Sequence, residues 1–293
     1  MKIVAVGGGK GGTGKTAIAV SIAKMFAIKR KILLVDLDVD NPCTYTLLSS
    51  KPEIIKEIYA FKPKILEDKC KLCGKCVEYC PVHALVLIPS KKILFIKTLC
   101  ESCGNCMIVC PEGAIKEDKA VIGWIKEDKM DNLHLIVGEA KPGERKTDEV
   151  MTETIEYVEK IAENYELLIF DVPPGTGRGI YDAFKLADLV VTVTEPTMLG
   201  FHDLKKLYSL IRSMNKKSIA IINKYGLKGG VQDEQEEFLR NNRVQYEKIP
   251  YDEYMVKAYV SGETVIEAYP DSPSARSIKK IVKNLEKIMF RSA

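Results

Sequence analysis

The segment that decides the fold is Gly9-Lys10-Gly11-Gly12-Thr13-Gly14-Lys15-Thr16. It matches the pattern G-x-x-x-x-G-K-[ST], follows the short apolar run Ile3–Val6 and opens a stretch of helical spacing, Gly14–Ile28. In this strand–loop–helix setting, glycines let backbone N–H groups surround phosphate oxygens, and the helix N-terminus adds positive potential. We therefore predict a nucleotide site in which Lys15 contacts the β- and γ-phosphates and the Thr16 hydroxyl binds Mg²⁺.

Apolar strands alternate with amphipathic helices over most of the chain. Such alternation indicates βαβ units and a mostly parallel sheet flanked by helices, an α/β fold. The predicted strands are Ile3–Val6, Ile32–Asp36, Leu133–Val137, Leu167–Asp171, Leu189–Thr194, Ser218–Asn223 and Val244–Ile249. The predicted helices are Gly14–Ile28, Asp148–Glu163, Gly179–Ala187, Gly200–Ser213, Gln232–Asn241 and Ser274–Met289, the last of which we expect to cover the sheet.

Composition excludes several classes of protein. The chain has 293 residues, 46% hydrophobic and 29% charged, which is typical of a globular protein and not of a disordered or collagen-like one. Because no apolar run approaches 18 residues and no signal peptide is evident, we expect a cytoplasmic protein without stable membrane insertion. A formal net charge of +4 is too small to argue for a nucleic-acid partner.

Eight of the nine cysteines lie in the middle of the chain, in two runs repeated at a period of 30 residues. A reducing compartment disfavours disulfides, so this clustering indicates metal. Both runs have the spacing C-x₂-C-x₂-C-x₃-C-P of bacterial two-cluster ferredoxins, in which the fourth cysteine binds the other cluster. The first [4Fe–4S] cluster is thus assigned to Cys70, Cys73, Cys76 and Cys110, and the second to Cys80, Cys100, Cys103 and Cys106.

The cysteine runs interrupt the strand–helix alternation. We therefore predict an α+β ferredoxin domain, residues 61–120, inserted into a discontinuous P-loop domain, residues 1–60 and 121–293. Zinc also accepts Cys₄ sites, but zinc ribbons do not need a duplicated run ending in proline. A simpler role for the clusters is to hold together an insertion too small for its own core. The ninth cysteine, Cys43, is expected to be an incidental thiol.

Lys10 places a second lysine in the glycine loop. Two such lysines resemble the deviant Walker A ATPases, the group of MinD, ParA, the Mrp-type carriers and the nitrogenase iron protein. The resemblance implies an ATP-dependent homodimer in which Lys10 crosses to the partner's nucleotide. The alternative is that Lys10 only adds local positive charge.

Two acidic segments extend the resemblance. Asp36-Leu-Asp38-Val-Asp40 is similar to the first switch of this family, and Asp38 is our choice for orienting the attacking water. The segment that begins at Phe170-Asp171 resembles the Walker B strand and second switch. We therefore expect Asp171, Thr16 and Asp38 to bind Mg²⁺. The expected catalytic residues are Lys10, Lys15 and Asp38.

The base site is expected near Asn223, which ends a strand, and near Pro250 and Tyr251, which resemble the family's segment beside the base. A guanine-binding site would have the motif N-K-x-D, whose aspartate binds the base. Here the motif starts at Asn223 and its last position, residue 226, is glycine, so adenine is favoured. The alternative is that the segment at Asn223, or the segment at Pro250 and Tyr251, is only a turn at the end of a strand and does not contact a base.

Three functions remain open at this point. The first is ATP-gated electron transfer through two [4Fe–4S] clusters to an unidentified redox partner. The second is iron–sulfur cluster carriage or assembly, with an apoprotein as acceptor. The third is a ParA/MinD-like positioning switch in which the ferredoxin domain only docks a partner.

Overall fold

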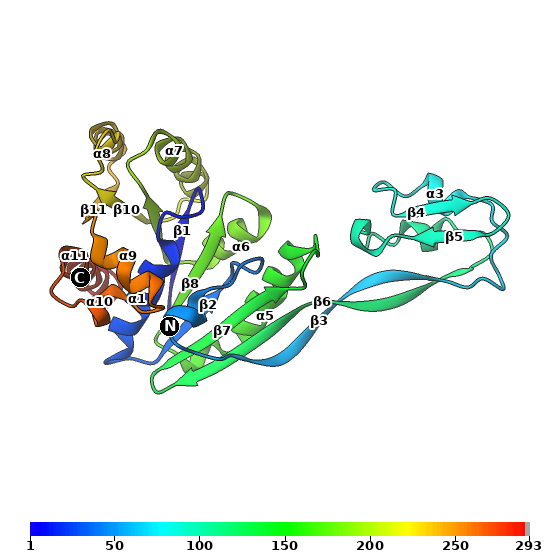
Figure 1. Ribbon diagram of the computed structural model, residues 1–293, viewed down its shortest axis with the longest axis horizontal. Coiled ribbons are helices and arrows are strands. Elements are labelled where there is room, and N and C mark those ends of the chain that lie inside the picture. Colours follow the sequence, from blue (N-terminus) through cyan, green and yellow to red (C-terminus); the bar gives the residue numbers. More distant parts are fainter. Residues whose placement is uncertain (291–293) are drawn as a thin grey trace.

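A nine-stranded sheet forms the centre of the protein, whose computed structural model describes residues 1–290 (Figure 1). The seven strands from β11 to β7 run parallel, whereas β6 and β3 are antiparallel to their neighbours. In spatial order the strands are β11 (Gln245–Pro250), β10 (Ser218–Tyr225), β9 (Leu189–Thr194), β1 (Lys2–Gly8), β8 (Leu167–Pro174), β2 (Ile32–Asp36), β7 (Leu133–Ala140), β6 (Ile115–Met130) and β3 (Glu53–Ile65).

Helices cover both faces of the parallel strands (Figure 1). One face packs against α1 (Lys15–Ala27), α9 (Glu253–Val260), α10 (Val265–Ala268) and α11 (Pro273–Phe290). The other packs against α5 (Thr147–Ile161), α6 (Arg178–Leu186) and α7 (Met198–Ser213), while α8 (Gln232–Asn241) covers β10 with Leu239. Strands buried on both faces need continuous apolar runs, and this is why they could be read from the sequence.

The predicted α/β fold is confirmed. β2, β9 and α8 have the predicted bounds, and α11 covers the sheet as expected, with Ile278, Ile281 and Leu285 buried. Helix α9 and the long strands β3 and β6 were not predicted from the sequence. None of the helices in residues 1–290 has the length and apolarity required to cross a membrane.

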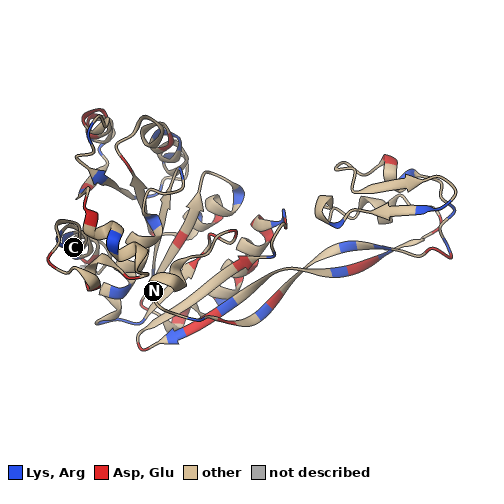
Figure 2. Ribbon diagram, viewed as in Figure 1, with Lys and Arg blue, Asp and Glu red and all other residues tan. Residues whose placement is uncertain are grey.

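β3 and β6 form an antiparallel ribbon that begins in the main sheet and projects far beyond it (Figure 1). Pairing runs from Glu53↔Glu127 to Ile65↔Ile115. The predicted domain boundaries, after residue 60 and before residue 121, therefore lie inside two continuous strands. Charged residues recur along the projecting part (Figure 2), and residues 116–119 of β6 are all exposed, so the ribbon lacks the long apolar runs that mark a strand buried on both faces.

The far end of the ribbon carries residues 66–114, which we call the tip (Figure 1). It contains the strands β4 (Leu85–Ile88) and β5 (Lys92–Phe95), the one-turn helices α3 (Lys75–Glu78) and α4 (Asn105–Ile108), and a 3₁₀ turn, Lys97–Leu99. The two cysteine runs have matching backbones, with positive φ at three pairs of positions 30 residues apart. These pairs are Leu72 and Ser102 (55° and 58°), Gly74 and Gly104 (76° and 75°), and His83 and Gly113 (51° and 57°).

Candidate functional site

The glycine loop lies between β1 and α1 at the carboxyl edge of the sheet. Gly12 and Gly14 have φ values of 78° and 93°, a region that favours glycine. A Cβ at Gly12 would meet nothing within 4 Å, so the loop is open where phosphate would approach. Lys15 is buried, and its Nζ donates to the Lys10 carbonyl at 3.1 Å. Burial lowers the pKa of Lys15, although Asp171 and Asp38 oppose that shift.

Two carboxylates face each other across neighbouring strands, because Asp36 of β2 pairs in register with Asp171 of β8. Asp36 is fully hydrogen-bonded: its Oδ2 accepts from the Cys43 N–H at 3.0 Å and from the Thr44 N–H and hydroxyl at 3.0 and 2.8 Å. It also accepts the Asp38 N–H at 3.1 Å. Asp36 therefore builds the loop that carries Asp38 and does not itself reach into the site.

Asp171 is in the opposite situation. It is 1% exposed, and neither carboxylate oxygen has a hydrogen-bond partner. Burial, reinforced by the charge of Asp36, raises the pKa of Asp171 well above its usual range, and Thr16 and Lys15 lie close enough to oppose this rise. Buried polar groups are nearly always paired, so an unpaired buried carboxylate beside a hydroxyl is suited to bind a cation.

Mg²⁺ fits this arrangement, because it is commonly held by one or two carboxylates and keeps several of its waters. Asp171 and Thr16 would supply the oxygen ligands, with Asp38 nearby. Asp38 is half-buried; burial raises its pKa, and the charge of Lys15 lowers it. The predicted residues Thr16, Asp38 and Asp171 are thus gathered beside the loop. Cys43 also lies there, and burial followed by the charge of Asp36 raises its thiol pKa to about 11.

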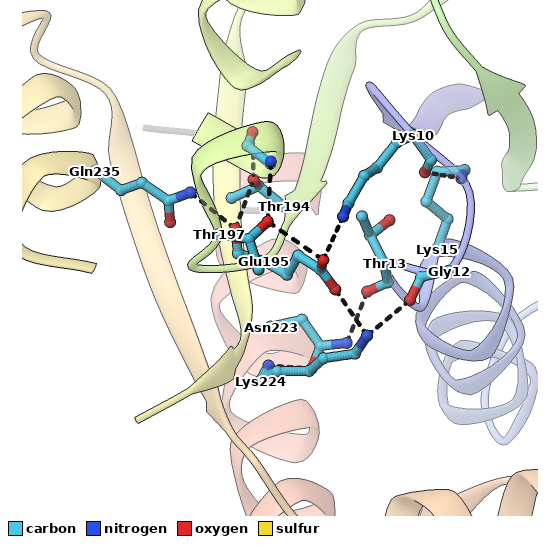
Figure 3. A network of polar contacts seen from close by, with 11 residues as sticks. Lys10, Gly12, Thr13, Lys15, Thr194, Glu195, Thr197, Asn223, Lys224 and Gln235 are labelled. Atoms are coloured by element: carbon cyan, nitrogen blue, oxygen red, sulfur yellow. Dashed lines mark hydrogen bonds and ion pairs between the residues drawn. The ribbon is translucent and has the colours of Figure 1, made fainter. Parts of the chain in front are cut away.

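Lys10 is folded back onto its own chain (Figure 3). Its Nζ lies 2.5 Å from Glu195 Oε1, at the end of β9, and Lys224 Nζ lies 2.7 Å from the other oxygen. Lys224 Nζ also donates to the Gly12 carbonyl at 2.9 Å. Burial alone would raise the pKa of Glu195, but these lysines outweigh it and lower the pKa. Glu195 was missed by sequence reasoning, since no local motif marks it.

Asn223, in β10, is hydrogen-bonded to the glycine loop. Its amide nitrogen donates to the Thr13 carbonyl at 2.8 Å, and its Oδ1 accepts the Lys224 N–H at 2.9 Å, so both ends are engaged within the chain (Figure 3). Pro250 ends β11 beside Tyr225, and the exposed Tyr251 donates its N–H to the Tyr225 carbonyl at 2.9 Å. These residues share one edge of the sheet with the loop, and their contact with a base stays a prediction.

The eight cysteines of the tip line two separate cavities that match the two predicted sets. The first contains Cys70, Cys73, Cys76 and Cys110, and the second contains Cys80, Cys100, Cys103 and Cys106. The fourth cysteine of each run thus joins the three of the other run. Backbone N–H groups of Ala84, Ser102 and Ala114 donate to the sulfurs of Cys80, Cys100 and Cys110 at 3.2, 3.4 and 3.3 Å.

Each of these cavities is lined by four thiols, the ligand set of one [4Fe–4S] cluster. A zinc site draws its thiolates to about 2.3 Å from one atom, whereas a cubane presents four separate iron atoms to them. Burial, and then the neighbouring Cys100, raises the pKa of the Cys106 thiol to about 11, and coordination to iron would favour its thiolate form. The residues therefore fit two [4Fe–4S] clusters.

Known proteins resemble this chain over most of its length. The AAA domain family matches residues 1–225. An uncharacterized protein of Methanocaldococcus jannaschii is 34% identical, covering 91% of this chain and 92% of that protein. An iron–sulfur cluster carrier protein of Aquifex aeolicus is 25% identical, covering 98% of this chain and 68% of that protein.

Solved structures share the fold. The cell division ATPase MinD of Pyrococcus furiosus superimposes with a TM-score of 0.60 at 16% identity, covering 98% of this chain and 99% of that one. MinD from Aquifex aeolicus gives 0.60 at 19% identity, covering 100% and 98%. With its glycine loop and its paired strand-end carboxylates, the chain belongs to the AAA domain family, and its fold is that of the MinD structures.

Proposed function

We propose that this protein is a Mg²⁺–ATP-dependent ATPase whose nucleotide-switched homodimer is coupled to electron transfer through two [4Fe–4S] clusters. The observation that carries the redox part is the grouping of the tip cysteines into two cavities, each with the four members of one ferredoxin-type ligand set. The nucleotide part is supported by the open glycine loop and by the orphaned carboxylate of Asp171.

Each residue of the nucleotide site has a role that its position supports. Backbone N–H groups of residues 9–16 and the Lys15 ammonium would bind the phosphates. Asp171 and Thr16 would hold Mg²⁺, which neutralises the charge developing on the transferred phosphoryl group. Asp38, on the loop fixed by Asp36, would orient the attacking water. Lys10 would leave Glu195 and reach the partner's nucleotide when the dimer forms.

Movement of the first switch has a short route to the ribbon. The carbonyl of Val39, next to Asp38, accepts the N–H of Ala140 at 2.8 Å. Ala140 ends β7 and pairs with Gly123, the residue at which β6 leaves the main sheet. Nucleotide-dependent displacement of Asp38 would therefore act at the root of the ribbon that carries the tip, and this supports coupling between ATP and the clusters.

The cluster part is tested by metal analysis of protein prepared without oxygen. We expect about eight iron atoms per chain, two [4Fe–4S] clusters, and no stoichiometric zinc. Hydrolysis of ATP should be abolished in Lys15→Ala, while the iron content of that variant stays unchanged. Two zinc atoms and no iron would overturn the redox proposal and leave the ATPase proposal standing.

Cluster carriage is the second candidate, favoured by the similarity to the Aquifex aeolicus iron–sulfur cluster carrier protein over 98% of this chain. The two candidates differ in what leaves the protein. A carrier transfers iron and sulfide to an apoprotein and loses its own absorbance, whereas an electron-transfer protein reduces its acceptor and keeps its iron. A positioning switch would instead show ATP-dependent binding to DNA or liposomes that does not depend on the clusters.

A further inference from the structure

Two lysines are buried within residues 1–290, Lys15 of the glycine loop and Lys62 of the ribbon. Lys62 is 5% exposed, and its Nζ donates to the carbonyl of Cys100 at 3.1 Å. The same Nζ lies 3.7 Å from Oε2 of Glu144, in the loop between β7 and α5. Lys62 thus links the second cysteine run to the body of the ATPase.

The duplication provides an internal comparison. At the period of 30 residues, Cys100 matches Cys70, and Lys62 on β3 matches Lys92 on β5. Lys92 is exposed, whereas Lys62 is buried. The two cluster sites therefore share a backbone but differ in their nearest buried charge.

The two cavities also differ in what they face. Ser102, in the second cysteine run, lines a cleft together with Asp148 and Glu149 of α5 and with Arg178, which follows the second switch. The cavity of the first set lies at the end of the ribbon, lined by residues 65–115, and none of residues 70–80, the first cysteine run, lines that cleft. The second set therefore lies toward the ATPase body, and the first set is distal.

We propose that Lys62 makes the two cluster sites unequal, so that an added electron resides on the second, body-facing cluster. Reduction adds one negative charge to a cluster, and a buried ammonium beside its ligand stabilises that charge. For unit charges about 10 Å apart at an effective dielectric constant of about 20, the attraction exceeds a tenfold change in an equilibrium constant. Glu144 partly offsets this bias and connects it to the ATPase. The inference rests on the proposed function.

The test is a redox titration of the anaerobically prepared protein, with dithionite as reductant and EPR as readout. In the wild type, the second cluster should be reduced first. Lys62→Met should lower the equilibrium constant for reduction of the second cluster about tenfold, equivalent to about 59 mV for a one-electron couple. Lys62→Arg keeps the charge and should restore wild-type behaviour, and Lys92→Met is the matched control that should change neither cluster.

Two further variants keep the inference testable if Lys62→Met does not load its clusters. Glu144→Gln removes the opposing charge without altering Lys62, and it should favour reduction of the second cluster further. Cys73→Ser and Cys103→Ser, each disrupting one site, assign the EPR signals. If both clusters of the wild type are reduced together, or Glu144→Gln changes nothing, the inference is overturned. If no iron is bound, the proposed function itself has failed.

Discussion

Replacing Asp171 with asparagine should stabilise the empty protein and abolish its response to nucleotide. The side chain is 1% exposed and both carboxylate oxygens lack hydrogen-bond partners, so ionising this carboxyl in the folded state is costly, which is why burial raises its pKa. A carboxyl whose pKa is higher in the folded than in the unfolded state lowers stability at neutral pH, by about 1.4 kcal/mol for each unit of difference. Asp171→Asn keeps the shape and cannot ionise, so the free energy of unfolding without nucleotide should rise by about 1–3 kcal/mol. The corresponding increase in Tm is roughly 2–10 °C.

With Mg²⁺ and ATP bound, the wild type should become more stable than Asp171→Asn. A ligand at about 100 times its Kd stabilises the folded state by about 2.7 kcal/mol, and Asp171→Asn should lose most of this gain. Calorimetric unfolding with EDTA, and then with Mg²⁺ and ATP, measures both effects. Asp36→Asn is the matched control: Asp36 accepts four hydrogen bonds, so this variant should be less stable than the wild type in both conditions. An Asp171→Asn protein that is destabilised without nucleotide, or that still responds to Mg²⁺ and ATP, would refute the assignment.

Three further predictions concern other parts of the chain. Glu195→Gln removes the charge that neutralises Lys10 and Lys224, so ATP should bind about 5- to 30-fold more tightly at low salt, and calorimetric titration at high salt should show a smaller gain. Burial alone would raise the pKa of Glu236, but hydrogen bonds from one lysine and two tyrosines lower it to about 2. The ionised Glu236 therefore stabilises the fold fully above its unfolded pKa of about 4.3, and this contribution is lost as the pH falls toward 2. In thermal unfolding, Glu236→Gln should show a smaller loss of Tm between about pH 4 and pH 2 than the wild type. Cys80→Ser should remove iron from the second cluster and spare the first, whereas loss of the first would contradict the crossed ligand sets.

The parallel part of the sheet was predictable because its signal is local. Residues 32–35 and 189–191 are buried on both faces, and burial on both faces requires uninterrupted apolar sequence. The glycine loop was predictable for the same reason, since a phosphate site built from consecutive N–H groups leaves its whole pattern in eight residues.

The remaining features depend on contacts between distant residues. In the projecting part of the ribbon, β6 carries the exposed charged residues 116–119 and β3 places Lys62 and Lys64 among apolar residues, so neither strand shows the uninterrupted apolar run of a strand buried on both faces. Asn223 binds the loop through Thr13, 210 positions earlier, and Glu195 meets Lys10 across a similar interval. Lys62 precedes the first cysteine run and contacts Cys100, which begins the second run 38 residues later. No sequence pattern records such pairings.

The central claim is that nucleotide and clusters act on each other. Its most direct test is the reduction potential of both clusters, measured by EPR-monitored titration of one anaerobic preparation without nucleotide, with Mg²⁺ and ADP, and with Mg²⁺ and ATP. The route from Asp38 through Val39 to the root of the ribbon predicts that ATP shifts the potential of the body-facing cluster and that ADP does not. Identical titrations in all three conditions, in protein that binds ATP and carries both clusters, would contradict the coupling.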